Sequence, residues 1–133
     1  MKILVINGSP AGENSITLQT MRFIQTYFPK QEVEVLHVGQ RIRTYEKDFA
    51  PAREAIEGAE LLIFCYPVYT FLVPAQLHRF LELLKDEGMD LHEKYATQIT
   101  TSKHFYDVTA HEFIRENCED LGLKVLPGLS ADM

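Results

Sequence analysis

The chain contains no tryptophan and only two cysteines, Cys65 and Cys118, among its 133 residues. Two cysteines make no disulfide framework, so a disulfide-stabilised secreted domain is excluded and a reducing compartment is expected. No apolar run reaches the ~20 residues that span a membrane. The first 15 residues show neither the basic region nor the cleavage pattern of a signal peptide. We therefore expect a cytoplasmic protein without a membrane span.

Positive charge is also scarce, with 13 Lys and Arg against 19 Asp and Glu and a net charge of −6. No cluster of Lys and Arg stands out along the chain, so nucleic-acid binding is not expected. Apolar residues make up 46% of the chain, which is enough for an ordinary packed core. Without repeats or low-complexity tracts, the sequence predicts a single domain over residues 1–133.

The start of the chain predicts a buried strand, a small polar loop and a helix. Residues 3–6 form a continuous apolar run, which is typical of a central strand in a parallel sheet. Residues 7–13 are mostly small or polar and interrupt this run, and a helical spacing of apolar residues begins at Ile16. Asn14 or Ser15 is the expected N-cap of the helix.

The loop itself lacks Lys and Arg, and it lacks the common phosphate fingerprints. Gly8 and Gly12 do not fit Gly-x-Gly-x-x-Gly, and no Gly-Lys-Ser/Thr follows. Glycines, hydroxyl side chains and the free N–H groups of a helix N-terminus nevertheless suit an anion. Neutral donors favour a phosphate monoester, as in flavin mononucleotide (FMN), over a triphosphate that needs Lys and Mg²⁺. The alternative is a tight, well-capped connection without a ligand.

Strands and helices alternate along the rest of the chain. Further strands are predicted at residues 32–38, 60–65, 95–101 and 123–126. Helices are predicted over about 15–29, from Asp48 to Gly58, from Pro74, and from Asp107 or Thr109 to Gly122. The polar stretch 39–48 is predicted to be a long loop.

This alternation predicts an α/β fold: a doubly wound, five-stranded parallel sheet with the flavodoxin-like order 2-1-3-4-5. Ligands of such sheets bind beyond the carboxyl ends of the strands, where the order reverses. The first loop (residues 8–15), the second loop (66–73) and the third loop (101–106) would share that rim. The last helix is missing, so we expect that the natural domain continues past Met133 or that a second subunit covers the exposed apolar face.

The second loop is unusually apolar for a surface connection. Tyr69 and Phe71 offer rings that can stack on a flat ligand, and the backbone N–H groups of residues 68–70 can bond ring nitrogens and carbonyls. The alternative is contact with a neighbouring subunit, and both can hold at once. This loop and the uncovered sheet face lead us to expect a homodimer or homotetramer.

Two motifs together resemble the flavodoxin-like NAD(P)H-dependent FMN reductases and flavodoxin-family quinone reductases. The first is Lys2-Ile-Leu-Val-Ile-Asn-Gly-Ser-Pro with Asn14-Ser15, and the second is Pro67-Val-Tyr-x-Phe followed by Pro74-Ala-Gln-Leu. Their order and spacing agree with the family through residue 85 or so. The resemblance implies FMN as cofactor and NAD(P)H as co-substrate.

The resemblance also implies which residues form the site. Ser9, Ser15 and Thr17 would hold the FMN phosphate, residues 67–70 would border the isoalloxazine ring, and the third loop would complete the site. The full set expected to contact FMN is Ser9, Asn14, Ser15, Ile16, Thr17, Pro67, Val68, Tyr69, Thr70, Phe71, Thr101 and Ser102.

The implied reaction passes hydride from NAD(P)H to flavin N5 and then electrons to a quinone or another small-molecule or protein acceptor. No general base is required. Lys103 and His104 are the candidates for stabilising negative charge on the reduced ring. The alternative for both is an ordinary solvated loop residue.

Two other functions stay open: an electron-transfer flavodoxin without NAD(P)H turnover, and a non-enzymatic interaction domain that has lost flavin. Arg41, Arg43, Lys47 and Lys103 favour the reductase, because they could receive a nicotinamide phosphate near the rim. No metal site is expected. Cys65 is predicted to be a small buried hydrophobe rather than a redox thiol.

Overall fold

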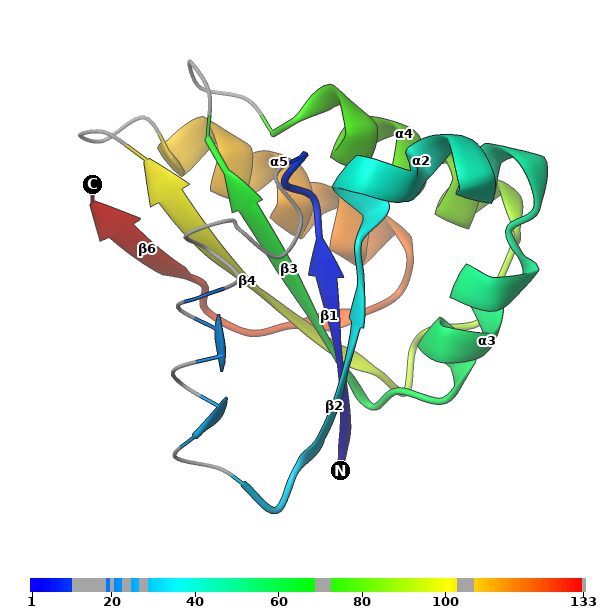
Figure 1. Cartoon of the computed structure of the whole chain (residues 1–133), viewed down its shortest axis with the longest axis horizontal. Helices are drawn as coiled ribbons and strands as arrows, with labels where there is room; N and C mark the ends of the chain where they lie inside the picture. Colours follow the sequence, from blue (N-terminus) through cyan, green and yellow to red (C-terminus); the bar gives the residue numbers. More distant parts are fainter. Residues whose placement is uncertain are drawn as a thin grey trace.

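The computed structural model describes residues 1–10, 19, 21–22, 25–26, 29–68, 73–102 and 107–132, with only the backbone for residues 101–102, 107–108 and 129–132. Its parallel sheet contains β1 (Lys2–Asn7), β2 (Glu32–Leu36), β3 (Leu61–Pro67), β4 (Tyr95–Ser102) and β5 (Lys124–Val125). These strands lie in the order β2-β1-β3-β4-β5 (Figure 1). The predicted α/β fold with flavodoxin-like strand order is confirmed.

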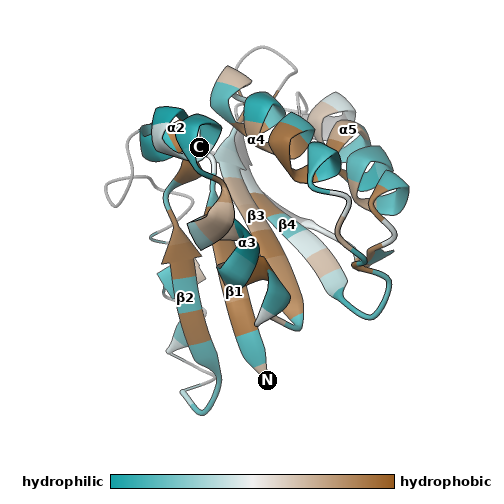
Figure 2. Cartoon of the chain, turned by 90° about the vertical axis from the view of Figure 1, so that its right-hand side faces the viewer, coloured by the Kyte–Doolittle hydropathy of each residue, from teal (hydrophilic) through white to brown (hydrophobic). Residues whose placement is uncertain are grey.

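Strand β1 is central, and its sequence explains why. Leu4, Val5 and Ile6 are fully buried, because β1 pairs with β2 on one edge and β3 on the other while both of its faces are covered. A strand buried on both faces needs consecutive apolar residues. Figure 2 shows β1, β2 and β3 hydrophobic along most of their length and β4 paler, as predicted for the fourth strand.

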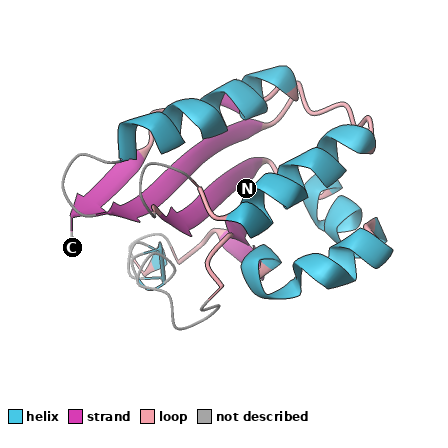
Figure 3. Ribbon diagram, turned by 90° about the horizontal axis from the view of Figure 1, so that it is seen from above, coloured by secondary structure: helices cyan, strands magenta, loops and turns pink. Residues whose placement is uncertain are grey.

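Four helices pack on one face of the sheet: α2 (Val38–Lys47), α3 (Ala50–Glu57), α4 (Ala75–Asp86) and α5 (Asp107–Asp120) (Figures 1 and 3). The predicted stripe of α4, Leu77, Phe80, Leu81 and Leu84, is buried. The described part of the first predicted helix lies on the opposite face, where Met21 packs against Val5, Ile63, Cys65 and Ile99. None of the helices that the structure describes is both long and apolar enough to cross a membrane.

The loop predicted at residues 39–48 is wrong, because α2 occupies this stretch. Val38 and Tyr45 are buried and Ile42 is half-buried, so one apolar residue falls on the same helix face at each turn. Tyr45 packs edge-on against Phe80 of α4, with 5.9 Å between the ring centroids. These three apolar residues alternate with exposed basic residues, so the sequence pattern is weak. The residue that packs against them, Phe80, lies far along the chain.

The predicted fifth strand ends at Pro127-Gly128 as expected, but the chain then resumes as β6 (Leu129–Asp132), which sequence reasoning missed. Strands β5 and β6 both pair with β4. Between the pairs Ala96–Val125 and Ile99–Leu129, the segment from β5 to β6 contains one residue more than β4 does. Such an insertion is a bulge. Pro127 fits it because its carbonyl accepts a hydrogen bond from the Thr97 hydroxyl at 2.8 Å.

The sheet face opposite α2–α5 carries an apolar cavity of about 380 Å³. Ile3, Val33, Val35 and Leu61 are only partly buried around it. These residues lie on β1, on β2 and at the first position of β3. The exposed apolar face expected from the missing last helix stays a prediction. The cavity is lined by Met1, Ile3, Met21, Gln25, Gln31, Val33, Ile63 and Ile99.

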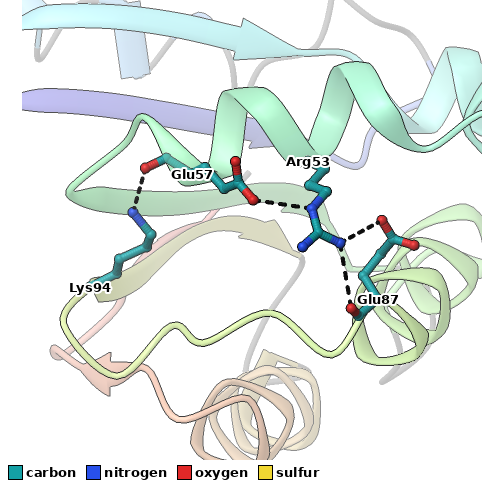
Figure 4. A network of polar contacts seen from close by, with 4 residues as sticks. All are labelled: Arg53, Glu57, Glu87 and Lys94. Atoms are coloured by element: carbon teal, nitrogen blue, oxygen red, sulfur yellow. Dashed lines mark hydrogen bonds and ion pairs between the residues drawn. The ribbon is translucent and has the colours of Figure 1, made fainter.

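At the amino ends of the strands, a polar network joins α3 to α4 and to the start of β4 (Figure 4). Arg53 contacts Glu57 at 3.1 Å and Glu87 of the α4 terminus at 3.2 Å. The Lys94 ammonium donates to the carbonyls of Glu57 at 2.9 Å and Ala59 at 2.6 Å. A cation on these carbonyls satisfies groups that the last turn of a helix leaves unpaired.

We expect Lys94→Met to lower the free energy of unfolding by about 1 kcal/mol, because two carbonyls lose a charged donor. Urea denaturation followed by far-UV circular dichroism measures this. Lys85→Met is the matched control: it removes only the exposed contact with Asp120 at 3.5 Å, which is worth less than about 0.5 kcal/mol. Equal losses in the two variants would contradict the role assigned to Lys94.

Candidate functional site

The carboxyl ends of β1, β3 and β4 lie side by side, so the starts of the first, second and third loops share one rim. Asn7 pairs with Cys65, and Cys65 pairs with Ile99, which sets the three strand ends at similar heights. The Gly8 N–H donates to the Cys65 carbonyl at 2.8 Å and extends the ladder by one residue. The order of the sheet reverses beside β1, as at the ligand sites of open α/β sheets.

Two helices press against the backbone at the start of the first loop. A Cβ on Gly39, in the first turn of α2, would lie 2.4 Å from the Ser9 carbonyl oxygen. A Cβ on Gly8 would lie 3.1 Å from the Leu77 side chain of α4. Glycine is required at position 39, since no side chain fits at that separation.

The side chain of Asn7 connects this loop to the end of β2. Its Oδ1 accepts the Ser9 N–H at 3.1 Å, and its Nδ2 donates to His37 Nδ1 at 3.3 Å. Asn7 is fully buried and Ser9 is 2% exposed. An Asn that bonds the N–H two residues on makes an Asx turn, which fixes the path of the backbone.

The structure places some of the predicted FMN contacts. Ser9 lies in the turn just described, Pro67 is the last residue of β3, and the buried Val68 follows it directly. Thr101 and Ser102 end β4, where their backbone pairs with β6 and Thr101 also pairs with Pro67. The other predicted residues lie outside the described part of the chain: Asn14, Ser15, Ile16, Thr17, Tyr69, Thr70, Phe71, Lys103 and His104.

A buried polar network lies directly below the second and third loops, and sequence reasoning missed it. The Tyr66 hydroxyl donates to Gln98 Oε1, and Gln98 Nε2 donates to the His111 carbonyl at 3.1 Å. The His111 ring contacts the Thr100 hydroxyl at 2.9 Å. Tyr66 and Thr100 are fully buried and Gln98 is 5% exposed. The network ties the ends of β3 and β4 to the beginning of α5.

The only signal for this network in the sequence is the alternation in β4. Gln98 and Thr100 take inward positions on the strand, in register with Phe64 and Tyr66 of β3. Polar residues at such positions need partners, because an unpaired buried polar group costs free energy. The sequence does not say which distant residues supply those partners.

Three of the basic residues proposed to receive a nicotinamide phosphate are exposed on α2. Helix α2 begins at the carboxyl end of β2, so Arg41 lies in the turn nearest the rim. Lys47 closes the helix at its far end, beyond a kink at Arg41, where the backbone leaves helical geometry. Arg41 is therefore the best placed of the three.

Neither cysteine is available for redox chemistry. Cys65 is fully buried and Cys118 is 1% exposed, and burial raises the pKa of each thiol to about 12. A thiol with such a pKa forms almost no reactive thiolate near neutral pH. The described residues also bring together no group of three or more His, Cys, Asp or Glu side chains that could hold a metal ion.

A comparison with protein families matches residues 1–130 to the NADPH-dependent FMN reductases. The chain belongs to this family. Membership confirms the resemblance noted in the sequence, and the family's name fits the predicted FMN cofactor and NAD(P)H co-substrate. This FMN reductase domain has no significant match among curated proteins.

Solved structures share the fold of the FMN reductase domain at low sequence identity. RosB, solved with the intermediate 8-demethyl-8-formylriboflavin-5'-phosphate, is 19% identical with a TM-score of 0.81; the alignment covers 99% of this chain and 65% of RosB. FerB, a flavoenzyme NAD(P)H:(acceptor) oxidoreductase from Paracoccus denitrificans, is 16% identical with a TM-score of 0.76, over 94% of this chain and 74% of FerB. The chain thus spans just under two thirds of the length of RosB.

An FMN-dependent NADH-azoreductase from Bacillus anthracis, solved in complex with FMN, is 14% identical with a TM-score of 0.67, over 99% of this chain and 87% of the azoreductase. The described start of the first loop, residues 8–10, carries no charged side chain. A Cβ on Gly39 would collide with the Ser9 carbonyl oxygen, and a Cβ on Gly8 would crowd the Leu77 side chain. Neutral donors such as those of Ser9 suit a phosphate monoester.

We expect Tyr66→Phe to destabilise the FMN reductase domain by roughly 1–3 kcal/mol, because Gln98 Oε1 stays buried without this donor. Urea unfolding without added flavin measures the effect. Tyr95→Phe is the matched control, since Tyr95 is 43% exposed and its change should stay below about 0.5 kcal/mol. A Tyr66 variant as stable as the control would show that the network contributes nothing.

Proposed function

We propose that this chain is an FMN-dependent NAD(P)H oxidoreductase that passes electrons to a quinone or another small-molecule or protein acceptor. The family match carries the proposal, because it extends over residues 1–130 and so includes all three rim loops. Two neighbours of the same fold support the class, one titled an NAD(P)H:(acceptor) oxidoreductase and one an FMN-dependent NADH-azoreductase.

Bound FMN would supply the redox chemistry, taking hydride from NAD(P)H and delivering electrons to the acceptor. The protein's part is binding and orientation. The first loop, beginning at the turn of Ser9, would hold the phosphate with neutral donors, together with Asn14, Ser15, Ile16 and Thr17. Arg41, exposed on α2 near the rim, would attract the phosphate of the nicotinamide co-substrate.

The second and third loops would enclose the ring system. Pro67 ends β3 and Val68 follows it, and the Tyr66–Gln98 hydrogen bond fixes this end of the strand. Tyr69, Thr70 and Phe71 would border the ring, and Thr101 and Ser102 would close the far side. Lys103 and His104 remain the candidates for stabilising negative charge on the reduced ring.

We further propose that residues 1–133 act as one cytoplasmic domain in a homodimer or homotetramer. Two free, buried thiols are compatible with a reducing compartment. The half-buried apolar residues around the cavity of about 380 Å³ support association. Sedimentation equilibrium should give two or four chains per particle, and a monomer at micromolar concentration would overturn the proposal.

The first experiment is a visible absorption spectrum of the purified chain after addition of FMN and desalting. We expect retained flavin bands that bleach when NADPH or NADH is added anaerobically, with the initial rates showing which nucleotide is preferred. Bands that bleach only with dithionite would instead indicate an electron-transfer flavodoxin. Loss of all FMN on desalting, together with no fluorescence quenching on titration, would contradict flavin binding by this chain.

A further inference from the structure

His37 has no part in the proposed function, yet it lies at the rim beside the first loop. It follows β2 directly and precedes α2, and its Nδ1 accepts the hydrogen bond from Asn7 Nδ2 at 3.3 Å. Its backbone carbonyl begins α2 by accepting the Arg41 N–H at 3.0 Å. Its side chain makes no capping bond to that helix. The side chain can therefore be exchanged without removing a cap.

The Asn7 amide is oriented by the Ser9 N–H on one side, and His37 holds its other side. The Ser9 N–H can only donate, so the oxygen of the amide must face Ser9 and the NH₂ group must face His37. The imidazole Nδ1 is then the acceptor of this bond. A rotated amide would turn its NH₂ group toward the Ser9 N–H and break that contact, and in a fully buried residue this is costly.

We propose that His37 is a positioning residue for the phosphate end of the cofactor and that it acts through Asn7. The imidazole holds the amide, the amide holds the Ser9 N–H, and the turn at Ser9 sets the start of the first loop. The inference rests on the proposed FMN function. A loop held in its binding conformation before the ligand arrives has less ordering entropy to lose, so removing the imidazole acceptor weakens binding of the phosphate.

This chain of contacts reaches only one end of the ligand. Asn7 and His37 lie at the ends of β1 and β2, whereas the second and third loops start from β3 and β4 on the other side of β1. Those loops keep their own anchor in the Tyr66–Gln98 network. Riboflavin, which has no phosphate, should therefore bind equally well with and without the imidazole.

The test measures the dissociation constants of FMN and riboflavin by flavin fluorescence in His37→Leu. We expect FMN affinity to fall roughly 3- to 10-fold, the range for one lost hydrogen bond, and riboflavin affinity to change less than about twofold. His92→Leu is the matched control, because His92 is 62% exposed and lies before β4, at the end of the strands away from the rim. Its affinities for both flavins should equal those of the unaltered chain.

Two further variants test the route through Asn7. In an Asn7→Ala background, His37→Leu should cause no additional loss of FMN affinity, as expected for residues that act as one unit. His37→Asn places an amide oxygen near the former Nδ1 and should retain FMN affinity within about twofold, and Asn is well tolerated at the start of a helix. This variant keeps the test decisive if the leucine variant does not fold.

The outcomes separate this inference from the proposed function. Four results would each overturn the role of His37 and leave the reductase proposal intact. In His37→Leu, these are an equal loss of affinity for FMN and riboflavin, or an unchanged affinity for FMN. In the other variants, they are additive losses in the double variant, or a loss of FMN affinity in His37→Asn. Failure of the unaltered chain to bind either flavin would overturn the proposed function, and the role of His37 with it.

Discussion

The rim of this protein depends on one close contact, between the first turn of α2 and the backbone of the first loop. A Cβ at position 39 would lie 2.4 Å from the Ser9 carbonyl oxygen and 2.6 Å from that of Gly8. Helix α2 can approach the loop this closely only because residue 39 is a glycine. Leu77 of α4 limits the loop at Gly8. The packing of two helices therefore sets the path of the loop, whatever the loop's own preference.

The same contact explains why α2 could not be predicted from its sequence. Its helix face contains only Val38, Ile42 and Tyr45, and its stability comes from Gly39 against the loop and Tyr45 against Phe80. Strands β1 and β3 were predictable because burial on both faces requires continuous apolar runs. Helix α4 was predictable because its four buried residues repeat with the helical period.

The far edge of the sheet shows a second limit of prediction. Pro127-Gly128 is a correct stop signal for β5, but it also fits a bulge within a longer edge that continues as β6. The difference lies in Gly128, where a Cβ would approach Gln98 Cγ to 2.7 Å. A close approach to a residue thirty positions away leaves no trace in the local sequence, so the resumption of pairing along β4 appears only in three dimensions.

The candidate site was predictable as far as its motifs extend. Ser9, Pro67 and Val68 lie at the rim where the motifs and strand order imply. The residues that hold the loops were not predicted, because Asn7 looks like the end of an apolar strand and Gln98 is one of several polar residues in β4. Their partners, His37 and His111, come from other elements. Sequence shows that such a residue needs a partner but does not identify it.

The two buried amides, Asn7 at the end of β1 and Gln98 within β4, have the same physical role. Asn7 accepts from Ser9 and donates to His37, and Gln98 accepts from Tyr66 and donates to the His111 carbonyl. Each joins a donor on one element to an acceptor on another without placing a charge in the interior. A carboxylate would bring an unpaired buried charge, and a hydroxyl is too short to span the same gap. These uncharged cross-links therefore hold the strands to their neighbouring elements without adding a fixed charge to the interior.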